Sequence, residues 1–346
     1  MRDVAERLGV SIMTVSRALR NAPNIAPKTR ETIIEEAKRL NFQPDPALGV
    51  LNAYRHGRRD RKTHDQMAFV TNFPQANGWK KIPTFARYFE GASRRAAQLG
   101  YTVEPFWVGD PAMTQRRASQ ILRDRGIRGL LVGPLFKGNT SLSLEWDWFS
   151  TVALGRSLIS PKLTTVSTNH FQGLLTACDA MLERGYRRIG FAITQYEDER
   201  TQSALRAAFL LVQSQRSEAN VPIYFANDFS SASITRWAKT HRPEVLLSSE
   251  PYHHELLPPK VRAKMGFVHL NIDPSSTGAG IDQSHDLVGE QAAALLHLKL
   301  LQRQTGVLER REMFLVDATW HDGIINRPVA RESIKVEKAP AAAAAI

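Results

Sequence analysis

The sequence predicts a small all-α unit followed by an α/β core of two parallel-sheet lobes. Three observations support this fold class. Apolar residues recur at helical spacing over residues 3–40, and apolar strands alternate with helices of about 10–15 residues from residue 65 onward. The length of 346 residues also exceeds what one compact core usually holds. We expect a helix-turn-helix headpiece over residues 1–45, a hinge helix and basic linker over 46–64, a two-lobed core over 65–330 and a disordered tail over 331–346.

The composition excludes several classes of protein. A lone cysteine, Cys178, cannot form an intrachain disulfide, and no Cys/His spacing resembles a zinc site. The longest apolar run, residues 129–136, is too short to span a membrane, and the opening MRDVAERLGV lacks the apolar core of a signal peptide. We therefore expect a cytoplasmic protein with no membrane partner, metal or cofactor.

The charge is unevenly distributed. The chain has 46 Lys and Arg against 34 Asp and Glu, a net charge of +12, which indicates a polyanionic partner, with a soluble basic enzyme as the alternative. Residues 1–64 hold 13 basic and 7 acidic residues, so half of the excess lies in less than a fifth of the chain. The densest stretch, RHGRRDRK at residues 55–62, is by composition typical of a solvated linker. Its position between two organised regions favours a role near phosphates.

Three short helices are expected in the first 45 residues. Gly9 ends the first, Ser11 is a suitable N-cap for the second, and Pro27 is a natural first residue of the third. Val15 and Leu19 lie four residues apart and would face the first helix. Two helices joined by a short turn that contains glycine are typical of a helix-turn-helix. The expected helices cover residues 3–8, 12–20 and 29–40.

The outward face of the second helix distinguishes a DNA reader from a plain helical bundle, which is the alternative. Its N-terminal half would meet base edges in a major groove. The residues that this helix leaves pointing outward are Ile12, Met13, Thr14, Ser16 and Arg17.

These segments resemble a known family. The sequence DVAERLGVSIMTVSRALRN, followed by KTRETIIEEAKRLNF before Pro44, is similar to the headpiece of the lactose-repressor (LacI/GalR) family of bacterial transcription regulators. Two departures stand out: Met1 is only two positions ahead of Asp3, and Ala26 stands where the family prefers a capping serine.

The resemblance implies roles for individual residues. Ile12, Met13 and Arg17 would read bases, since a guanidinium can donate two bonds to a guanine and the two apolar side chains can contact a thymine methyl. Phosphate or groove-edge contacts are implied for Ser11, Thr14, Ser16, Arg20 and Asn24.

A hinge is expected after the headpiece. Asp45-Pro46 resembles a cap followed by a first-turn proline, and the short helix that follows would be marginal in isolation. The family implies that a leucine in this hinge wedges into the minor groove, and Leu51 matches it. Leu48-Gly49 replaces the family's Ala-Arg pair, and a linker leucine without contacts is the alternative.

From residue 65 the pattern predicts βαβ units, with a break between the lobes near residues 160–169. Ligands of open parallel sheets bind beyond the carboxyl ends of the strands, which two facing lobes would place in the cleft between them. Strands are expected at residues 66–73, 101–108, 127–135, 151–158, 188–193, 221–225, 244–249 and 267–273. Helices are expected at residues 84–99, 114–125, 171–184, 201–215, 231–240 and 289–303.

The resemblance extends more weakly over residues 66–328 and implies a fold similar to periplasmic sugar-binding proteins. Its landmarks include PTF at residues 83–85 and RGYRRIG at 184–190. Phe85 would stack on a ring or belong to the core. Asp273, which would end an apolar strand, is expected to be functional. The effector-contacting positions that the family implies are Phe85, Arg200, Arg206, Glu250 and Asp273, and surface ion pairs are the alternative for Arg200, Arg206 and Glu250.

The core also departs from the family. Thr168 replaces an aspartate, Phe209 a glycine and Glu250 an aspartate. Trp79, in the long loop over residues 74–81, is a candidate for stacking on a sugar, and a core or lid tryptophan is equally compatible with the sequence. We expect a small polar effector, with saccharides as one class.

Three functions compete. The first is a regulator of transcription, a repressor, that reads a palindromic operator in double-stranded DNA as a homodimer and responds to the effector. The second is a small-molecule binding protein or enzyme with a non-specific basic arm, and the third is a protein that compacts nucleic acid. Enzyme motifs such as G-x-S-x-G, the P-loop and H-E-x-x-H are absent, so we expect no catalytic residue. The run His253-His254-Glu255 is followed by Pro258 and Pro259, which break the helix that a metal site would need.

Overall fold

The computed structural model describes residues 2–19, 25–40, 65–136, 140–215, 221–227 and 229–325. The chain divides into two compact units, residues 1–63 and 64–346. The predicted tail over 331–346 and the whole of the predicted hinge and linker over 46–64 lie outside the described residues.

The N-terminal unit is a three-helix cluster. Gly9 adopts a positive φ of 63° after the first helix, and the Ser11 hydroxyl accepts the Thr14 backbone N–H at 3.0 Å to cap the second, as predicted. No side chain caps the third helix at Ala26, and proline stands in its first turn. The helices are α1 (Arg2–Leu8), α2 (Ile12–Leu19) and α3 (Pro27–Arg39), and the buried core is Val4, Ala5, Val15, Ala18, Ile33 and Ala37.

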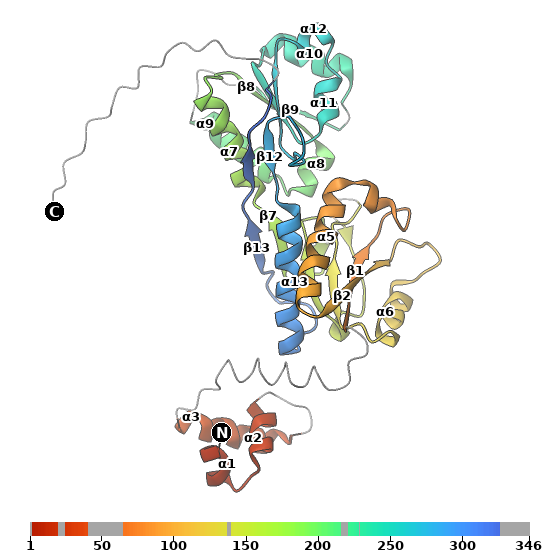
Figure 1. Ribbon diagram of the computed structural model, residues 1–346, viewed down its shortest axis with the longest axis vertical. Helices are drawn as coiled ribbons and strands as arrows, with labels where there is room; N and C mark the ends of the chain where they lie inside the picture. Colours follow the sequence, from red (N-terminus) through yellow and green to blue (C-terminus); the bar gives the residue numbers. More distant parts are fainter. Residues whose placement is uncertain are drawn as a thin grey trace, which may run out of the picture. The chain divides into compact units, whose positions relative to one another are not determined.

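The first lobe of the larger unit has a six-stranded parallel sheet in the order β13-β7-β5-β3-β1-β2. Helices α5 and α13 pack against one face, and α6 covers the other (Figure 1). The elements are β1 (Asp65–Thr71), η1 (Gly78–Lys81), α5 (Pro83–Gln98), β2 (Tyr101–Trp107), α6 (Gln115–Asp124), β3 (Gly129–Val132), β4 (Thr140–Ser141), η2 (Trp146–Trp148), β5 (Ser150–Leu154), β6 (Leu158–Ser160), β7 (Thr165–Thr168), α13 (His285–Gln302) and β13 (Met313–Val316).

The second lobe has the sheet order β14-β12-β11-β10-β8-β9, parallel except for the pairing of β12 with β14. Helices α7 and α9 cover one face and α10 the other. The elements are α7 (His170–Glu183), β8 (Ile189–Thr194), α8 (Gln195–Arg200), α9 (Ala204–Ser214), β9 (Tyr224–Ala226), α10 (Ser231–His241), β10 (Val245–Ser248), α11 (Pro251–Glu255), α12 (Pro259–Arg262), β11 (Gly266–His269), β12 (Gly280–Asp282) and β14 (Thr319–His321).

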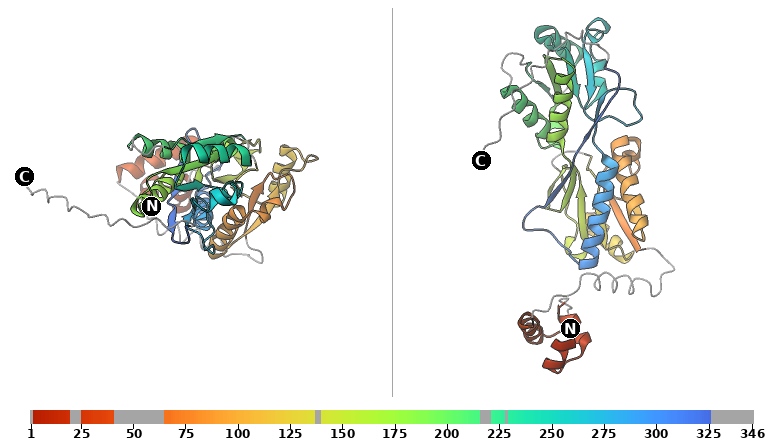
Figure 2. Two further views of the ribbon diagram at one scale, coloured as in Figure 1. Left: turned by 90° about the horizontal axis from the view of Figure 1, so that it is seen from above. Right: turned by 60° about the vertical axis from the view of Figure 1, so that its left-hand side comes forward.

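The chain crosses between the lobes three times. It passes from β7 to α7 at Asn169, returns between β12 and α13, and passes up again between β13 and β14. The right-hand view of Figure 2 shows the third crossing as the dark blue segment that runs between the two sheets. The first lobe is therefore completed by α13 and β13, which come late in the sequence.

Several sequence expectations need correction. The strand expected at 151–158 is interrupted at Gly155, which has a φ of 71°, and forms β5 and β6. The strand expected at 267–273 ends at His269, and the helix expected at 201–215 begins at Ala204 after a separate helix, α8. The break expected near 160–169 contains β7, a strand of the first sheet.

Helices α5 and α13 pack closely against each other in the first lobe (Figure 1). A Cβ atom on Gly91 would lie 1.9 Å from the backbone oxygen of Asp286, and one on Gly289 would lie 2.2 Å from that of Tyr88. Only glycine permits this approach, since a methyl group at either position would collide with backbone.

Candidate DNA-recognition face and interlobe cleft

The second helix presents its N-terminal half to solvent. Ile12 is 49% exposed and Met13 61%, although both are large apolar residues, and Arg17 is exposed as well. Val15 and Ala18 on the opposite side are buried in the headpiece core. One face of α2 therefore packs in the headpiece core. The opposite face presents apolar and guanidinium groups to solvent, as a helix that enters a major groove does.

The hydroxyl groups on this helix are partly committed to the fold. Ser11 Oγ lies 2.9 Å from Thr14 Oγ1 in addition to capping the helix. Ser16 and Thr14 are half-buried. The predicted contacts of Arg20, Asn24 and Leu51 lie outside the described residues.

The core brings two of the predicted effector residues together. Arg200 ends α8 in the second lobe, and its guanidinium lies 5.3 Å from the Phe85 ring centroid at the start of α5 in the first. The guanidinium also lies 5.5 Å from the Tyr196 ring. Phe85 is 94% buried against Phe73, so it is both a core residue and one wall of the Arg200 environment.

Side chains from both lobes meet across the cleft. Arg200 Nη1 donates to the Leu135 oxygen at 2.8 Å, and the Tyr196 hydroxyl donates to the Phe136 oxygen at 2.7 Å. Leu135 and Phe136 follow β3, whereas α8 follows β8, so the contacts join the carboxyl ends of the two sheets. This is the position at which parallel sheets bind ligands.

Two buried carboxyl groups, those of Glu197 and Glu250, have raised pKa values. Burial raises the pKa of Glu197 to about 7, and Glu197 lies in α8 with His253 Nε2 3.9 Å from its Oε2. Burial also raises the pKa of Glu250, and the positive charge of Arg200 partly offsets this effect.

The His253 ring is fully buried and its Nδ1 lies 2.5 Å from Ser248 Oγ. Burial lowers the pKa of His253 to about 4, so its ring is neutral at pH 7.

Arg206 and Asp273 do not join this group. Arg206 pairs with Asp198 at 2.8 Å and lies 4.9 Å from the Phe225 ring, so the ion-pair alternative describes its contacts. Asp273 lies in an exposed turn, where it accepts the Ser275 backbone N–H at 2.9 Å and the Ser275 hydroxyl at 2.6 Å. These bonds lower the pKa of Asp273. The expectation that Asp273 ends a strand is wrong, because β11 ends four residues earlier.

The structure resolves the alternatives for Trp79 in favour of the core. Its side chain is 1% exposed and packs against Phe69 and Phe89 at ring distances of 5.5 and 5.0 Å. A ring enclosed in this way cannot stack on a bound sugar.

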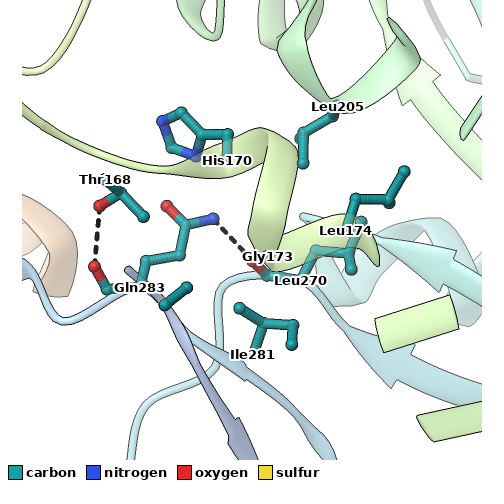
Figure 3. Close-up of a pocket in the computed structure, with 9 residues that line it drawn as sticks. Thr168, His170, Gly173, Leu174, Leu205, Leu270, Ile281 and Gln283 are labelled. Carbon is teal, nitrogen blue, oxygen red and sulfur yellow. Dashed lines mark hydrogen bonds between the residues drawn. The ribbon is translucent and has the colours of Figure 1, made fainter. Parts of the chain in front are cut away.

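The crossings between the lobes enclose a small pocket (Figure 3). Thr168 Oγ1 donates to the Gln283 oxygen at 2.7 Å, and Gln283 Nε2 donates to the Leu270 oxygen at 2.6 Å, which ties the first crossing to the second. The surrounding side chains leave no room for a water molecule. His170 lies beside this pocket, and burial lowers its pKa to about 3.

Sequence reasoning missed several groups in the cleft. Arg156 lies two residues after β5, His170 two residues after β7, and Tyr196 and Glu197 two and three residues after β8. Their common signal is a position just after a buried parallel strand. No group of three His, Cys, Asp or Glu side chains able to hold a metal occurs among the described residues.

The comparisons with known proteins agree with this architecture. Residues 1–45 match the family model of bacterial regulatory proteins, lacI family. A relative, the HTH-type transcriptional regulator MalR of Streptococcus pneumoniae, is 24% identical over 261 residues, covering 71% of this chain and 73% of MalR. The N-terminal unit therefore matches the lacI family of bacterial regulatory proteins.

Solved structures of lacI-family proteins share its fold. One is a putative transcriptional regulator from Rhizobium etli, with a TM-score of 0.58 and 15% identity over 75% of this chain and 98% of that one. Another is the lac repressor dimer bound to operator and an anti-inducer, with a TM-score of 0.52 and 17% identity over 95% and 98% of the two chains. The family match and the relatives, which are transcriptional regulators, support a DNA-binding role in regulation of transcription. Among the described helices, none has the length and apolar character needed to cross a bilayer.

Proposed function

We propose that this protein is a cytoplasmic repressor of the lacI family that reads a palindromic operator as a homodimer. The exposure of Ile12, Met13 and Arg17 on one face of α2 is the observation that supports base reading. Two copies of a helix-turn-helix unit recognise two half-sites, and the symmetry of the dimer is mirrored in the operator. The lac repressor dimer on its operator supports the same stoichiometry by analogy.

The cleft supplies the second part of the proposal. A small polar effector binds among Phe85, Arg200 and Glu250 and changes the contacts that hold the lobes together. The Arg200 and Tyr196 bonds to Leu135 and Phe136 are the ones in its path. An effector alters operator affinity only if it binds one lobe arrangement more tightly than the other.

A binding selection from random double-stranded DNA tests the DNA-binding part. We expect the full chain to select a palindromic motif, and a chain that starts at Asp65 to lose DNA binding. A basic protein without base recognition would bind the selected and random sequences equally, and an interaction that survives removal of the headpiece would contradict the assignment.

A further inference from the structure

Two arginine side chains of the cleft differ from the other arginines around it. Arg87 pairs with Asp282 at 2.9 Å and with Asp286 at 2.8 Å, and Arg206 pairs with Asp198. Arg156 and Arg200 have no carboxylate within ion-pair distance in the described part of the chain. Their guanidinium groups are therefore half-buried without a direct ion pair, and Arg200 has only a longer-range electrostatic interaction with Glu250.

The bonds that these two arginines make are to neutral acceptors. Arg200 Nη1 donates to the oxygens of Leu135 at 2.8 Å and Phe136 at 3.4 Å. Arg156 Nη1 donates to the Thr201 oxygen at 3.4 Å, a long bond, and its buried Nε has no partner among the described residues. A carboxylate or phosphate would bind either fork more strongly than backbone carbonyls do, because charge-assisted bonds are roughly twice as strong as neutral ones.

The Arg156 side chain reaches the segment that carries Arg200, at the end of α8. Arg156 donates to the residue that follows Arg200, and Gln202 Nε2 donates back to the Arg156 oxygen at 3.2 Å. Both charges act on the buried ring of His170 and lower its pKa in addition to the larger effect of burial. Two arginine side chains directed at one half-buried segment can both donate to one anion, whose charge-assisted bonds would be stronger than bonds to backbone carbonyls.

Aromatic surface adjoins the pair. The Phe85 and Tyr196 rings flank the Arg200 guanidinium, and Phe73 contacts both Phe85 and Phe136 at ring distances of 4.9 and 5.3 Å. Such walls fix the orientation of a guanidinium and offer an apolar face to the carbon skeleton of a ligand. The carboxyl groups of Glu250 and Glu197 are also buried. Because a carboxyl group can bond a hydroxyl but repels an anion when it is ionised, these two groups favour hydroxyl groups of a ligand over a second anion.

We propose that the ligand of this cleft is a small polyhydroxylated acid, a sugar or polyol that bears a carboxylate or phosphate, with the oxyanion held between Arg156 and Arg200. The inference rests on the proposed effector function and names the chemical class that the cleft selects. Bidentate bonds from the planar guanidinium groups would replace the backbone acceptors, and the hydroxyl groups of the ligand would face Glu250.

Matched pairs of ligands test this assignment on the full-length protein. Melting temperature and calorimetric affinity are measured with glucose, gluconate, glucuronate, glucose 6-phosphate and inorganic phosphate at millimolar concentration. We expect at least one acid to stabilise the protein and glucose to have no effect. The carboxylate and phosphate arms then separate the two forms of the oxyanion. Stabilisation by glucose equal to that by its acids, or none by any acid, would overturn the proposal.

Variants locate the oxyanion. Arg156→Gln and Arg200→Gln should each weaken binding of the stabilising acid about tenfold or more, the loss expected for a hydrogen bond to a charged group. Arg200→Lys should also weaken it, because lysine keeps the charge but not the fork, whereas Arg116→Gln on the exposed face of α6 should have no effect. Unchanged affinity in both glutamine variants would refute the site. Operator binding, measured on the same samples, distinguishes the outcomes: if it persists, the regulator assignment stands whatever the acids do.

Discussion

The phenolic hydroxyl of Tyr196 donates a 2.7 Å hydrogen bond to the backbone oxygen of Phe136 on the opposite lobe. This bond and that of Arg200 start from one short helix, α8, and end on one loop after β3. The helix therefore couples the second lobe to the first. We expect a ligand that binds between the lobes either to break these bonds or to bind alongside them.

Removal of the Tyr196 hydroxyl should weaken the contact between the two lobes. In Tyr196→Phe we expect the free energy that holds the lobes in contact to fall by about 1 kcal/mol, the usual net value of one hydrogen bond. Amide hydrogen exchange in residues 133–136 and 195–202 should rise roughly fivefold. Gln195→Ala, which removes only an exposed bond on the same helix, is the control. Equal exchange in the tyrosine variant and the wild type would show that the bond does not hold the lobes.

Glu197 should make stability depend on pH. Its folded-state pKa of about 7 lies above the ordinary value of 4.5, so folding favours the protonated acid. The stability that this group supports is full below pH 4.5 and is lost as the pH rises through 7. Relative to Glu197→Gln, the wild type should lose up to about 3 kcal/mol of unfolding free energy between pH 4.5 and 8. Urea denaturation of both proteins across this range measures the difference, and a difference independent of pH would contradict the prediction.

The buried histidines act in the opposite direction. Burial lowers the pKa of His170 to about 3 and those of His253 and His254 to about 4, below the ordinary 6.5. Their neutral rings support the fold above pH 6.5, and this support is lost as the pH falls toward the folded-state values. In the Glu197→Gln background, the urea midpoint should fall between pH 7 and pH 5. A flat midpoint would mean that these rings are accessible to protons without unfolding.

The glycine contact between α5 and α13 should tolerate no side chain. Gly91→Ala places a methyl group against the Asp286 backbone oxygen, and forcing the helices apart should cost about 3 kcal/mol. Gly78→Ala is a matched control, because the nearest atom to its added Cβ is a side-chain carbon of Phe73 at 3.5 Å. Thermal denaturation should separate the two variants clearly. Similar melting temperatures would indicate that the helices move apart easily.

Arg17 should control operator specificity. Its guanidinium is the one exposed cation on the predicted base-reading face, so Arg17→Ala should relax selection at one guanine per half-site by about 1–3 kcal/mol. Competition binding between the selected operator and a copy changed at that guanine measures the effect. Arg39→Ala on α3 gives a comparison in which one cation is removed elsewhere in the headpiece, and it should leave the preference intact. An unchanged preference in the Arg17 variant would disprove the assignment.

The sequence identified the elements whose pattern is local. Helix periodicity placed α5, α7 and α13 within a few residues, and turn chemistry identified Gly9 and the Ser11 cap. Short strands such as β7, β12 and β13 were missed, because three or four residues give little periodicity. The membership of β13 in the first sheet depends on pairing with a strand about 150 residues earlier, which no local pattern records.

The cleft was predictable in location but not in detail. The rule that ligands bind beyond the carboxyl ends of parallel strands predicted a site at the edge where Phe85 and Arg200 meet. The side-chain environment was less accessible: Trp79 turned inward because its ring fills a gap between two phenylalanines, and Asp273 caps a turn. Among the described residues Arg156 has no carboxylate within ion-pair distance, a property that depends on tertiary packing and that no local sequence pattern records.

The late return of the chain to the first lobe affects how the protein is made. A ribosome that has released residues 65–168 has produced β1, β3, β5 and β7 and helix α5, but neither α13 nor β13. The apolar face of α5 that α13 covers must remain exposed while the whole second lobe is synthesised. The second lobe likewise receives β14 only at the end, so neither lobe can complete its folding as an independent N-terminal unit. The nascent chain therefore carries an uncovered apolar helix face until α13 has been synthesised.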